Sequence, residues 1–218
     1  MKKHTIKIQK TARYFTLGEA GARTKHAWFL CHGYAQLGNY FLPHFEALND
    51  GTSLLVAPEG LHRFYAQGFS GRVGASWMTK EDRLDDIRDY VHALDAICEE
   101  VLRDLPQDVR VHVLGFSQGS ATVSRWMATG KSRADTLTLW CGFFPPDLDW
   151  NAGRERLKNR RTFIVTASQD EFISPEQEKE QLENFRAQGI SFEHLRFEGK
   201  HTIDQETLLK LRARVCGE

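Results

Sequence analysis

The chemistry available to this sequence is indicated first by Ser117. This serine is the third residue of the motif Gly-Phe-Ser-Gln-Gly, residues 115–119, which joins a strand-like apolar run at 109–114 to a helix-like run at 121–128. Glycines on both sides of a serine permit the sharp bend that lifts the hydroxyl away from the edge of a sheet. An ordinary turn serine is the alternative, but the strand, the two glycines and the helix together predict a nucleophile at Ser117.

A serine hydroxyl keeps its proton in neutral water, so a nucleophilic Ser117 needs a histidine as base and a carboxylate that orients the histidine. His201 follows the last predicted strand, 191–197, and Asp170 comes just after another, 162–166. Because open α/β sheets place their sites at the carboxyl ends of the strands, we expect these three side chains to converge.

Other side chains compete with Asp170 and His201. For the acid, Glu171 is adjacent, and Asp147 or Asp149 follows the preceding predicted strand. For the base, two other histidines fall within predicted strands and His92 lies within a predicted helix, away from the carboxyl edge, which favours His201. The competing histidines are His44, His62, His92, His112 and His194.

Attack on a carbonyl produces a negatively charged oxygen, which must be met by preformed hydrogen-bond donors. The backbone N–H of Gln118, at the start of the predicted helix, is one candidate. The backbone N–H of Tyr34 is the second, because it follows the predicted strand 27–31, and Gly33 permits a tight turn there. We expect His32 to brace this loop, and the Tyr34 ring either to form a wall of the entrance or to pack on the surface.

Strand-like and helix-like segments alternate along the chain, which predicts an α/β fold with a mostly parallel central sheet and helices on both faces. Two segments with polar alternation, 5–9 and 13–17, are expected to form an antiparallel hairpin at the edge of the sheet. No linker or repeat divides the sequence, so residues 1–218 are expected to form a single domain. Strands are expected at 27–31, 53–57, 109–114, 136–140, 162–166 and 191–197, and helices at 38–48, 84–105, 118–129, 175–188 and 203–215.

The overall charge excludes some classes of partner. Lys and Arg together number 29, as do Asp and Glu, so no positive field is available for nucleic acid or an anionic membrane surface. No apolar run reaches membrane-spanning length and no signal-like segment follows the N-terminal lysines, so we expect a cytoplasmic protein. The four cysteines are scattered without a metal-ligand spacing, which predicts reduced core thiols and no metal.

The chain resembles the phospholipase/carboxylesterase family of α/β-hydrolases, which includes small bacterial carboxylesterases and acyl-protein thioesterases. The resemblance rests on residues 30–34, the motif at 115–120, the Asp170 loop and residues 199–201, and so extends over most of the chain. It implies an α/β-hydrolase fold and hydrolysis of short- to medium-chain carboxylic esters or thioesters without a cofactor. The serine, aspartate and histidine named above take the family's triad positions.

The sequence departs from this family in one loop. Family members commonly carry His-Gly-x-Gly-Asp there, whereas this chain has His-Gly-Tyr-Ala-Gln at residues 32–36. The change alters loop flexibility and local charge, so the family's substrate preferences do not carry over.

Residues 59–83 are expected to be an irregular insertion rich in aromatic side chains, and the chain leaves no room for a large cap domain. Phe69 and Trp77 are candidates for the wall of a shallow substrate pocket. The alternative is that these rings pack the loop onto the body of the protein. A shallow cleft favours small soluble esters.

The expected activity is hydrolysis of a small acyl ester or thioester through an acyl-enzyme on Ser117. An acyltransferase or a peptidase on the same fold is the alternative enzyme, and a non-catalytic ligand-binding protein is the alternative from another class. Both a monomer and a homodimer are compatible with the sequence.

Overall fold

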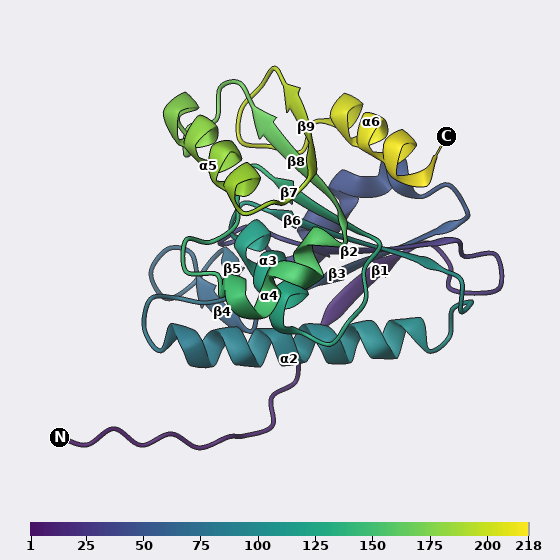
Figure 1. Ribbon diagram of the computed structural model, residues 1–218. Coiled ribbons are helices and arrows are strands. Elements are labelled where there is room, and N and C mark those ends of the chain that lie inside the picture. The colour runs from purple at the N-terminus through teal and green to yellow at the C-terminus, as the bar shows by residue number, and fades with distance from the viewer. Residues whose placement is uncertain (218) are drawn as a thin grey trace.

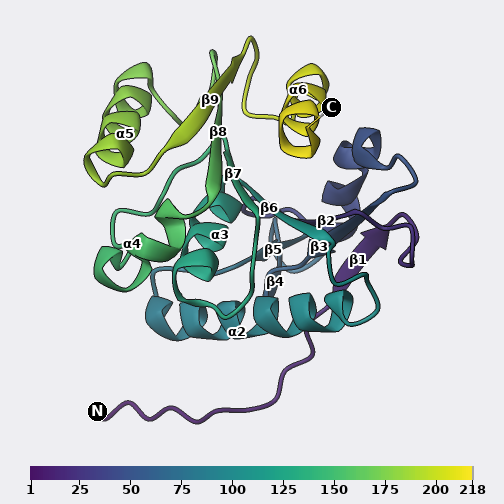
Figure 2. The same ribbon diagram turned by 45° about the vertical axis from the view of Figure 1, so that its right-hand side comes forward.

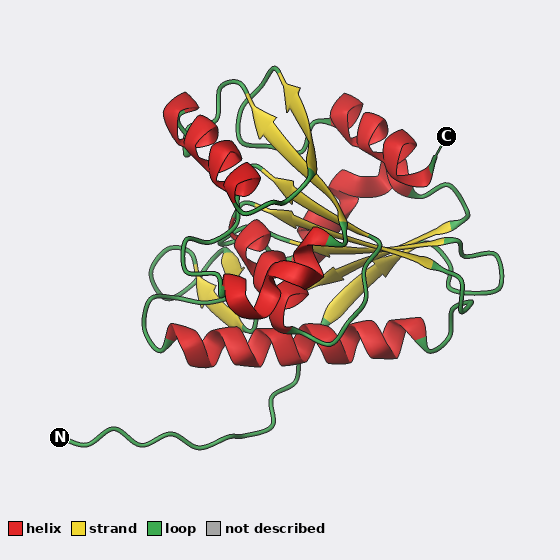
Figure 3. Cartoon of the chain, viewed as in Figure 1, coloured by secondary structure: helices red, strands yellow, loops and turns green. Residues whose placement is uncertain are grey.

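A seven-stranded sheet with the strand order β1-β3-β2-β6-β7-β8-β9 forms the centre of the structure, a computed structural model that describes residues 1–217 (Figures 1 and 3). β1 runs antiparallel to β3, and the other neighbouring pairs of this sheet are parallel, as the sequence predicted. The strands of the sheet are β1 (Tyr14–Leu17), β2 (His26–Cys31), β3 (Ser53–Pro58), β6 (Arg110–Phe116), β7 (Thr136–Trp140), β8 (Arg161–Ala167) and β9 (Phe192–Phe197).

Helices cover both faces of the sheet. Figures 1 and 2 show α2, α3, α4 and α5 on one side, and α6 with the 3-10 helix η1 on the other. The helices are α1 (Gly38–Phe41), η1 (Leu42–Leu48), α2 (Arg83–Leu102), α3 (Gln118–Thr129), α4 (Trp150–Lys158), α5 (Pro175–Ala187) and α6 (Gln205–Cys216). The helix expected at 38–48 is thus a short α-helix continued by a 3-10 helix, with Pro43 near the start of the latter.

Each face of the sheet has its own apolar core. In β6, Val111 and Val113 pack into the core that contains α2 and α3, whereas Leu114 and Phe116 pack into the core that contains η1 and α6. Successive strand residues point to opposite faces, so a strand buried on both sides reads as a continuous apolar run. This is why the central strands could be located from the sequence.

The antiparallel edge of the sheet is confirmed, but its pairing differs from the hairpin that was expected. β1 pairs with β3, with Tyr14 opposite Pro58, while residues 5–9 form no strand. Ile6 and Ile8 are exposed there, and the N-terminal segment runs away from the sheet in Figure 1. Alternation of polar and apolar residues predicts a strand only where a sheet face is available to bury the apolar side.

Two elements were not expected. The segment 59–83 contains an antiparallel hairpin, β4 (His62–Tyr65) and β5 (Val73–Ser76), which forms a separate two-stranded sheet (Figure 3). Helix α4 was also missed, because its sequence is polar and carries Gly153 in the middle. A Cβ atom on Gly153 would lie 2.5 Å from the Cβ of Ala128, so this glycine permits close packing of α4 on α3.

The state of the cysteines agrees with a further expectation. None of the four cysteines forms a disulfide, and Cys31, Cys98 and Cys141 are buried. Within the described residues, no helix has the length and apolar character needed to cross a bilayer. That residues 1–218 form a single domain stays a prediction.

Candidate active site

Ser117 occupies a strained turn between β6 and α3. Its φ of 55° and ψ of −118° lie in a region that side-chain-bearing residues rarely adopt. The turn is compact: a Cβ atom on Gly115 would lie 2.2 Å from the carbonyl oxygen of Gly119, and one on Gly119 would lie 2.1 Å from that of Cys31. The two motif glycines are therefore required by the close approach of backbone to backbone, as the sequence predicted.

The structure brings His201 and Asp170 into direct contact. The Nδ1 atom of His201 lies 2.8 Å from Oδ2 of Asp170, whose side chain is only 2% exposed. The other oxygen, Oδ1, accepts a hydrogen bond from the backbone N–H of Phe172 at 2.8 Å. Because an ionised carboxylate can only accept, Nδ1 carries the proton of a neutral His201 and Nε2 retains a lone pair.

Two aromatic rings hold the imidazole of His201 next to the turn. The rings of Phe116 and Phe172 each lie 4.8 Å from it, measured between centroids. Phe116 is the residue before Ser117, so the imidazole lies against the end of β6 that carries the serine. The three side chains thus come from one edge of the sheet, after β6, β8 and β9.

The alternative acids have other contacts. Glu171 accepts a hydrogen bond from the backbone N–H of His201 at 3.2 Å, so it holds the loop and not the ring. Asp147 pairs with Arg125 at 2.7 Å and with Arg83. Asp149 is exposed just before α4.

Three other histidines also have structural contacts. His112 and His194 hydrogen-bond to threonine hydroxyls within the sheet, Thr136 and Thr166 respectively. His32 donates from Nδ1 to the carbonyl oxygen of Gly33 at 2.7 Å and accepts from Gly60 N–H at Nε2, at 3.0 Å. Burial lowers the pKa of His32, so it remains neutral. It braces the loop, as expected.

The loop after β2 packs directly against Ser117. A Cβ atom on Gly33 would lie 3.2 Å from the Cβ of Ser117. In the part of the chain that the structure describes, the backbone N–H groups of Tyr34 and Gln118 donate no hydrogen bond to protein. Both are therefore available as donors beside Ser117. The Tyr34 ring is exposed and stacks on Phe64, with the centroids 5.3 Å apart.

The residues that depart from the family's loop pattern have defined roles in this structure. Ala35, where family members commonly have glycine, takes a φ of 59°. Its N–H donates to the carbonyl oxygen of Ala75 in β5 at 2.9 Å. The side chain of Gln36 accepts from Gly33 N–H at 2.7 Å, which closes the turn. The hairpin β4–β5 and the Gln36 amide thus hold the loop without the glycine and the aspartate.

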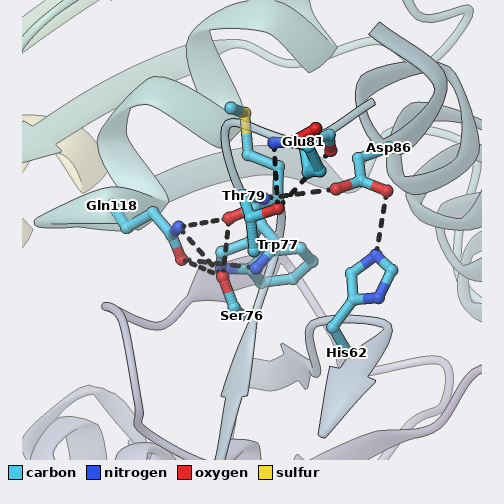
Figure 4. A network of polar contacts seen from close by, with 8 residues as sticks. His62, Ser76, Trp77, Thr79, Glu81, Asp86 and Gln118 are labelled. Carbon is cyan, nitrogen blue, oxygen red and sulfur yellow. Dashed lines mark hydrogen bonds and ion pairs between the residues drawn. The ribbon is translucent and has the colours of Figure 1, made fainter. Parts of the chain in front are cut away.

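Gln118 contributes a side-chain role that the sequence analysis missed. Its amide oxygen accepts from Trp77 N–H at 3.3 Å, and its amide nitrogen donates to the carbonyl oxygen of Met78 at 3.1 Å. Figure 4 shows the Gln118 side chain directed at this segment, where it also contacts the hydroxyl of Ser76. In the sequence, this role was indicated only by the position of Gln118, whose amide has both a donor and an acceptor group, directly after Ser117.

The aromatic residues proposed for the pocket lie elsewhere. Trp77 is 1% exposed, and its indole N–H donates to the carbonyl oxygen of His32 at 2.9 Å. Its ring therefore packs beneath the loop and does not face an open pocket, which corrects the expectation. Phe69 is almost fully exposed. The cleft beside the loop is instead lined by other rings of the same segment, Phe64 and Tyr65.

Three side chains with potential metal-ligand atoms meet at this site. Cys141, Asp170 and His201 each offer one ligand atom, and these atoms lie within 4.8 Å of one another. However, burial raises the pKa of the Cys141 thiol, and the charge of Asp170 raises it further. The Nδ1 atom of His201 and the Oδ2 atom of Asp170 bond to each other.

Comparison with known proteins identifies the family of this chain. Residues 23–210 match the model of the family described as serine hydrolase (FSH1). The chain belongs to this serine hydrolase family. A comparison with curated proteins gives no match.

Solved structures named as esterases, carboxylesterases and a thioesterase share the fold. A carboxylesterase from Mesorhizobium loti has a TM-score of 0.74 and 22% identity, with 95% of each chain covered. An acyl-protein thioesterase 2 from Zea mays has a TM-score of 0.71 and 16% identity, with 95% of this chain and 99% of that chain covered. The esterase PE8 has a TM-score of 0.71 and 19% identity over the same shares. The serine hydrolase chain thus has the α/β-hydrolase fold, with no cap domain among the described residues, and the resemblance read from its motifs is confirmed.

Proposed function

We propose that the chain hydrolyses carboxylic esters through a catalytic triad of Ser117, His201 and Asp170. One observation carries this proposal. The Asp170 carboxylate holds Nδ1 of His201 at 2.8 Å, beside the strained turn that presents Ser117. Membership of a serine hydrolase family supports the same chemistry.

In the first half-reaction, Nε2 of His201 accepts the hydroxyl proton as Ser117 Oγ attacks the acyl carbon. Asp170 stays ionised and stabilises the imidazolium that forms. The imidazolium then gives its proton to the leaving alcohol or thiol as the carbon–oxygen or carbon–sulfur bond breaks. The product of this half-reaction is an acyl ester on Ser117.

In the second half-reaction, His201 takes a proton from water, and the resulting hydroxide attacks the acyl-enzyme. The proton returns to Ser117 Oγ as the acid product leaves. The backbone N–H groups of Tyr34 and Gln118 supply the donors for the oxyanion in both halves. No cofactor takes part in any step.

The substrate class is a small-molecule ester or thioester with a short to medium acyl chain. Structures named as carboxylesterases and as an acyl-protein thioesterase are similar in fold, which is consistent with both leaving groups. A cytoplasmic location and a monomer or homodimer remain predictions.

Different measurements would distinguish an esterase from each alternative: a binding protein without turnover, a peptidase or an acyltransferase. A fluorophosphonate labels an activated serine but not a pure binder. Cleavage of peptides identifies a peptidase. Faster capture of the acyl group by an added alcohol or amine than by water identifies an acyltransferase.

The Ser117→Ala variant tests the proposal, with Ser70→Ala, in an exposed loop, as its matched control. Hydrolysis of p-nitrophenyl esters and acyl thioesters of graded length should fall by about 10³-fold or more in the first variant. Fluorophosphonate labelling should vanish there and persist in the control. Labelling that survives the loss of Ser117, with circular dichroism unchanged, would assign the nucleophile to another residue.

A further inference from the structure

A cationic cleft opens beside the loop that carries Tyr34. We define it by three arginines, Arg13, Arg63 and Arg72, and its volume is about 1030 Å³. That volume is at the upper end of the ~300–1000 Å³ typical of small-molecule sites. None of its lining residues, all within the described part of the chain, is an aspartate or a glutamate.

The positive charge of this cleft is only partly balanced. Oε1 of Glu59 accepts from Nε of Arg13 at 2.6 Å and from Arg63 at 3.4 Å, and the Glu59 side chain is fully buried. Within the described residues, Arg72 has no ion pair. Three guanidinium groups against one carboxylate leave a formal excess of two positive charges.

Such an excess favours an anionic ligand. Guanidinium groups stay protonated and present a planar fork of donors that matches a carboxylate. Arg13 is held by Glu59 at short distance, whereas the Arg63 contact is long and Arg72 is exposed. Arg63 and Arg72 are therefore the groups that are available to a ligand.

Apolar side chains form much of the remaining wall of the cleft, beside the polar Gln36 and His44. Phe41, Phe64, Tyr65 and Val73 contribute rings and methyl groups. A purely ionic ligand would leave these surfaces in water, so the lining fits a molecule with a hydrocarbon body and one charged end.

The cationic cleft adjoins the candidate active site. Ala35 and Gln36 line it and belong to the loop that packs on Ser117. Phe41 lies 6.0 Å from the Phe116 ring, which in turn lies 4.8 Å from His201, between centroids. The cleft and the turn that carries Ser117 thus share the loop of Ala35 and Gln36.

We propose that this cleft selects esters or thioesters whose acyl chain ends in a second, free carboxylate, and that Arg63 and Arg72 bind this carboxylate. This inference rests on the proposed function, because it assigns the substrate class of the same site. The apolar walls take up the methylene chain between the two ends.

Matched substrates test the inference. The p-nitrophenyl monoesters of adipic, suberic and sebacic acid carry the free carboxylate, and their methyl-capped counterparts have nearly the same shape without the charge. We expect kcat/KM to be about tenfold or more higher for the charged member at the best length. High salt should reduce this preference, because it screens a partly exposed ion pair.

Variants locate the effect. Arg72→Ala and Arg63→Ala should each lower kcat/KM for the charged ester by about tenfold and leave the capped ester within about twofold. Arg103→Ala, an exposed arginine at the end of α2, is the control and should change neither. Arg72→Lys should keep part of the preference, because it retains the charge without the fork.

The outcomes separate this inference from the proposed function. Equal rates for charged and capped esters, unchanged in the arginine variants, would overturn the inference while hydrolysis by Ser117 stands. A stronger, arginine-dependent preference for the corresponding phosphonate ester would overturn the assignment to a carboxylate. No hydrolysis of either ester, together with an unlabelled Ser117, would overturn the proposed function itself.

Discussion

The side-chain amide of Gln118 donates a hydrogen bond to the carbonyl oxygen of Met78, at 3.1 Å. The amide oxygen of the same side chain accepts from Trp77 N–H, so both ends of the amide are engaged. Gln118 follows the proposed nucleophile, and Met78 lies just beyond the β4–β5 hairpin. These hydrogen bonds hold the start of α3 against a segment some 40 positions earlier in the chain. They therefore also position the backbone N–H of Gln118, which is proposed to bind the oxyanion.

The Gln118→Ala variant keeps that backbone N–H but loses its anchor. We expect kcat to fall by about tenfold with KM nearly unchanged, since a donor that meets charge only in the transition state affects kcat. Thr129→Ala, at the far end of the same helix, is the control and should retain full activity. A rise in KM at constant kcat would show instead that Gln118 acts through substrate binding.

Asp170 sets the tautomer of His201, and the Asp170→Asn variant tests this role. An asparagine amide can donate to Nδ1, which moves the imidazole proton to Nε2 and removes the base. We expect kcat to fall by about 10³- to 10⁴-fold with little change in the free energy of unfolding.

Glu171→Gln is the matched comparison for Asp170→Asn. It alters the neighbouring acid, which accepts a hydrogen bond from the backbone N–H of His201. We expect its kcat to stay within a fewfold of the parent value. If Glu171→Gln were the more damaging change, the acid of the triad would be Glu171.

Much of this site was predictable from the sequence because its signals are local. The turn at Ser117 is encoded by glycines two residues away on each side, and His201 and Asp170 each come soon after a run that reads clearly as a strand. Parallel topology then brings the carboxyl ends of these strands to one edge.

What the sequence did not predict depends on contacts between distant segments. Trp77 reads as a pocket residue in an aromatic loop, but its indole N–H meets the carbonyl oxygen of His32, 45 positions earlier. The β4 strand has only four residues, His62 and Arg63 followed by two aromatic ones, so it shows no clear alternation of polar and apolar side chains. The cationic cleft joins Arg13 to a hairpin some 50 residues later. No local sequence pattern predicts such a contact between distant segments.

His112 provides a test of the sheet that carries the site. It lies within β6, where Nε2 contacts Nδ1 of His26 at 2.9 Å and Nδ1 contacts the Thr136 hydroxyl at 2.9 Å. Burial, together with smaller electrostatic contributions from His26 and Arg110, lowers its pKa from 6.5 to about 3. The folded protein therefore keeps His112 neutral at pH values where an unfolded chain would protonate it.

This difference predicts how stability changes with pH. Between pH 6.5 and about 3 the unfolded state binds this proton and the folded state does not. Protonation of His112 in the unfolded state therefore has no effect on the free energy of unfolding above pH 6.5 and lowers it progressively as the pH falls through this range. At pH 5 the loss from His112 amounts to about 2 kcal/mol in the free energy of unfolding. Urea titrations at pH 7.5 and pH 5 measure it.

The His112→Gln variant cannot take up this proton, so the decline in its free energy of unfolding between pH 7.5 and pH 5 should be smaller by about that amount. His92→Gln, on the exposed face of α2, should decline like the parent protein. Equal declines in all three proteins would mean that His112 is already protonated within the folded sheet at pH 5.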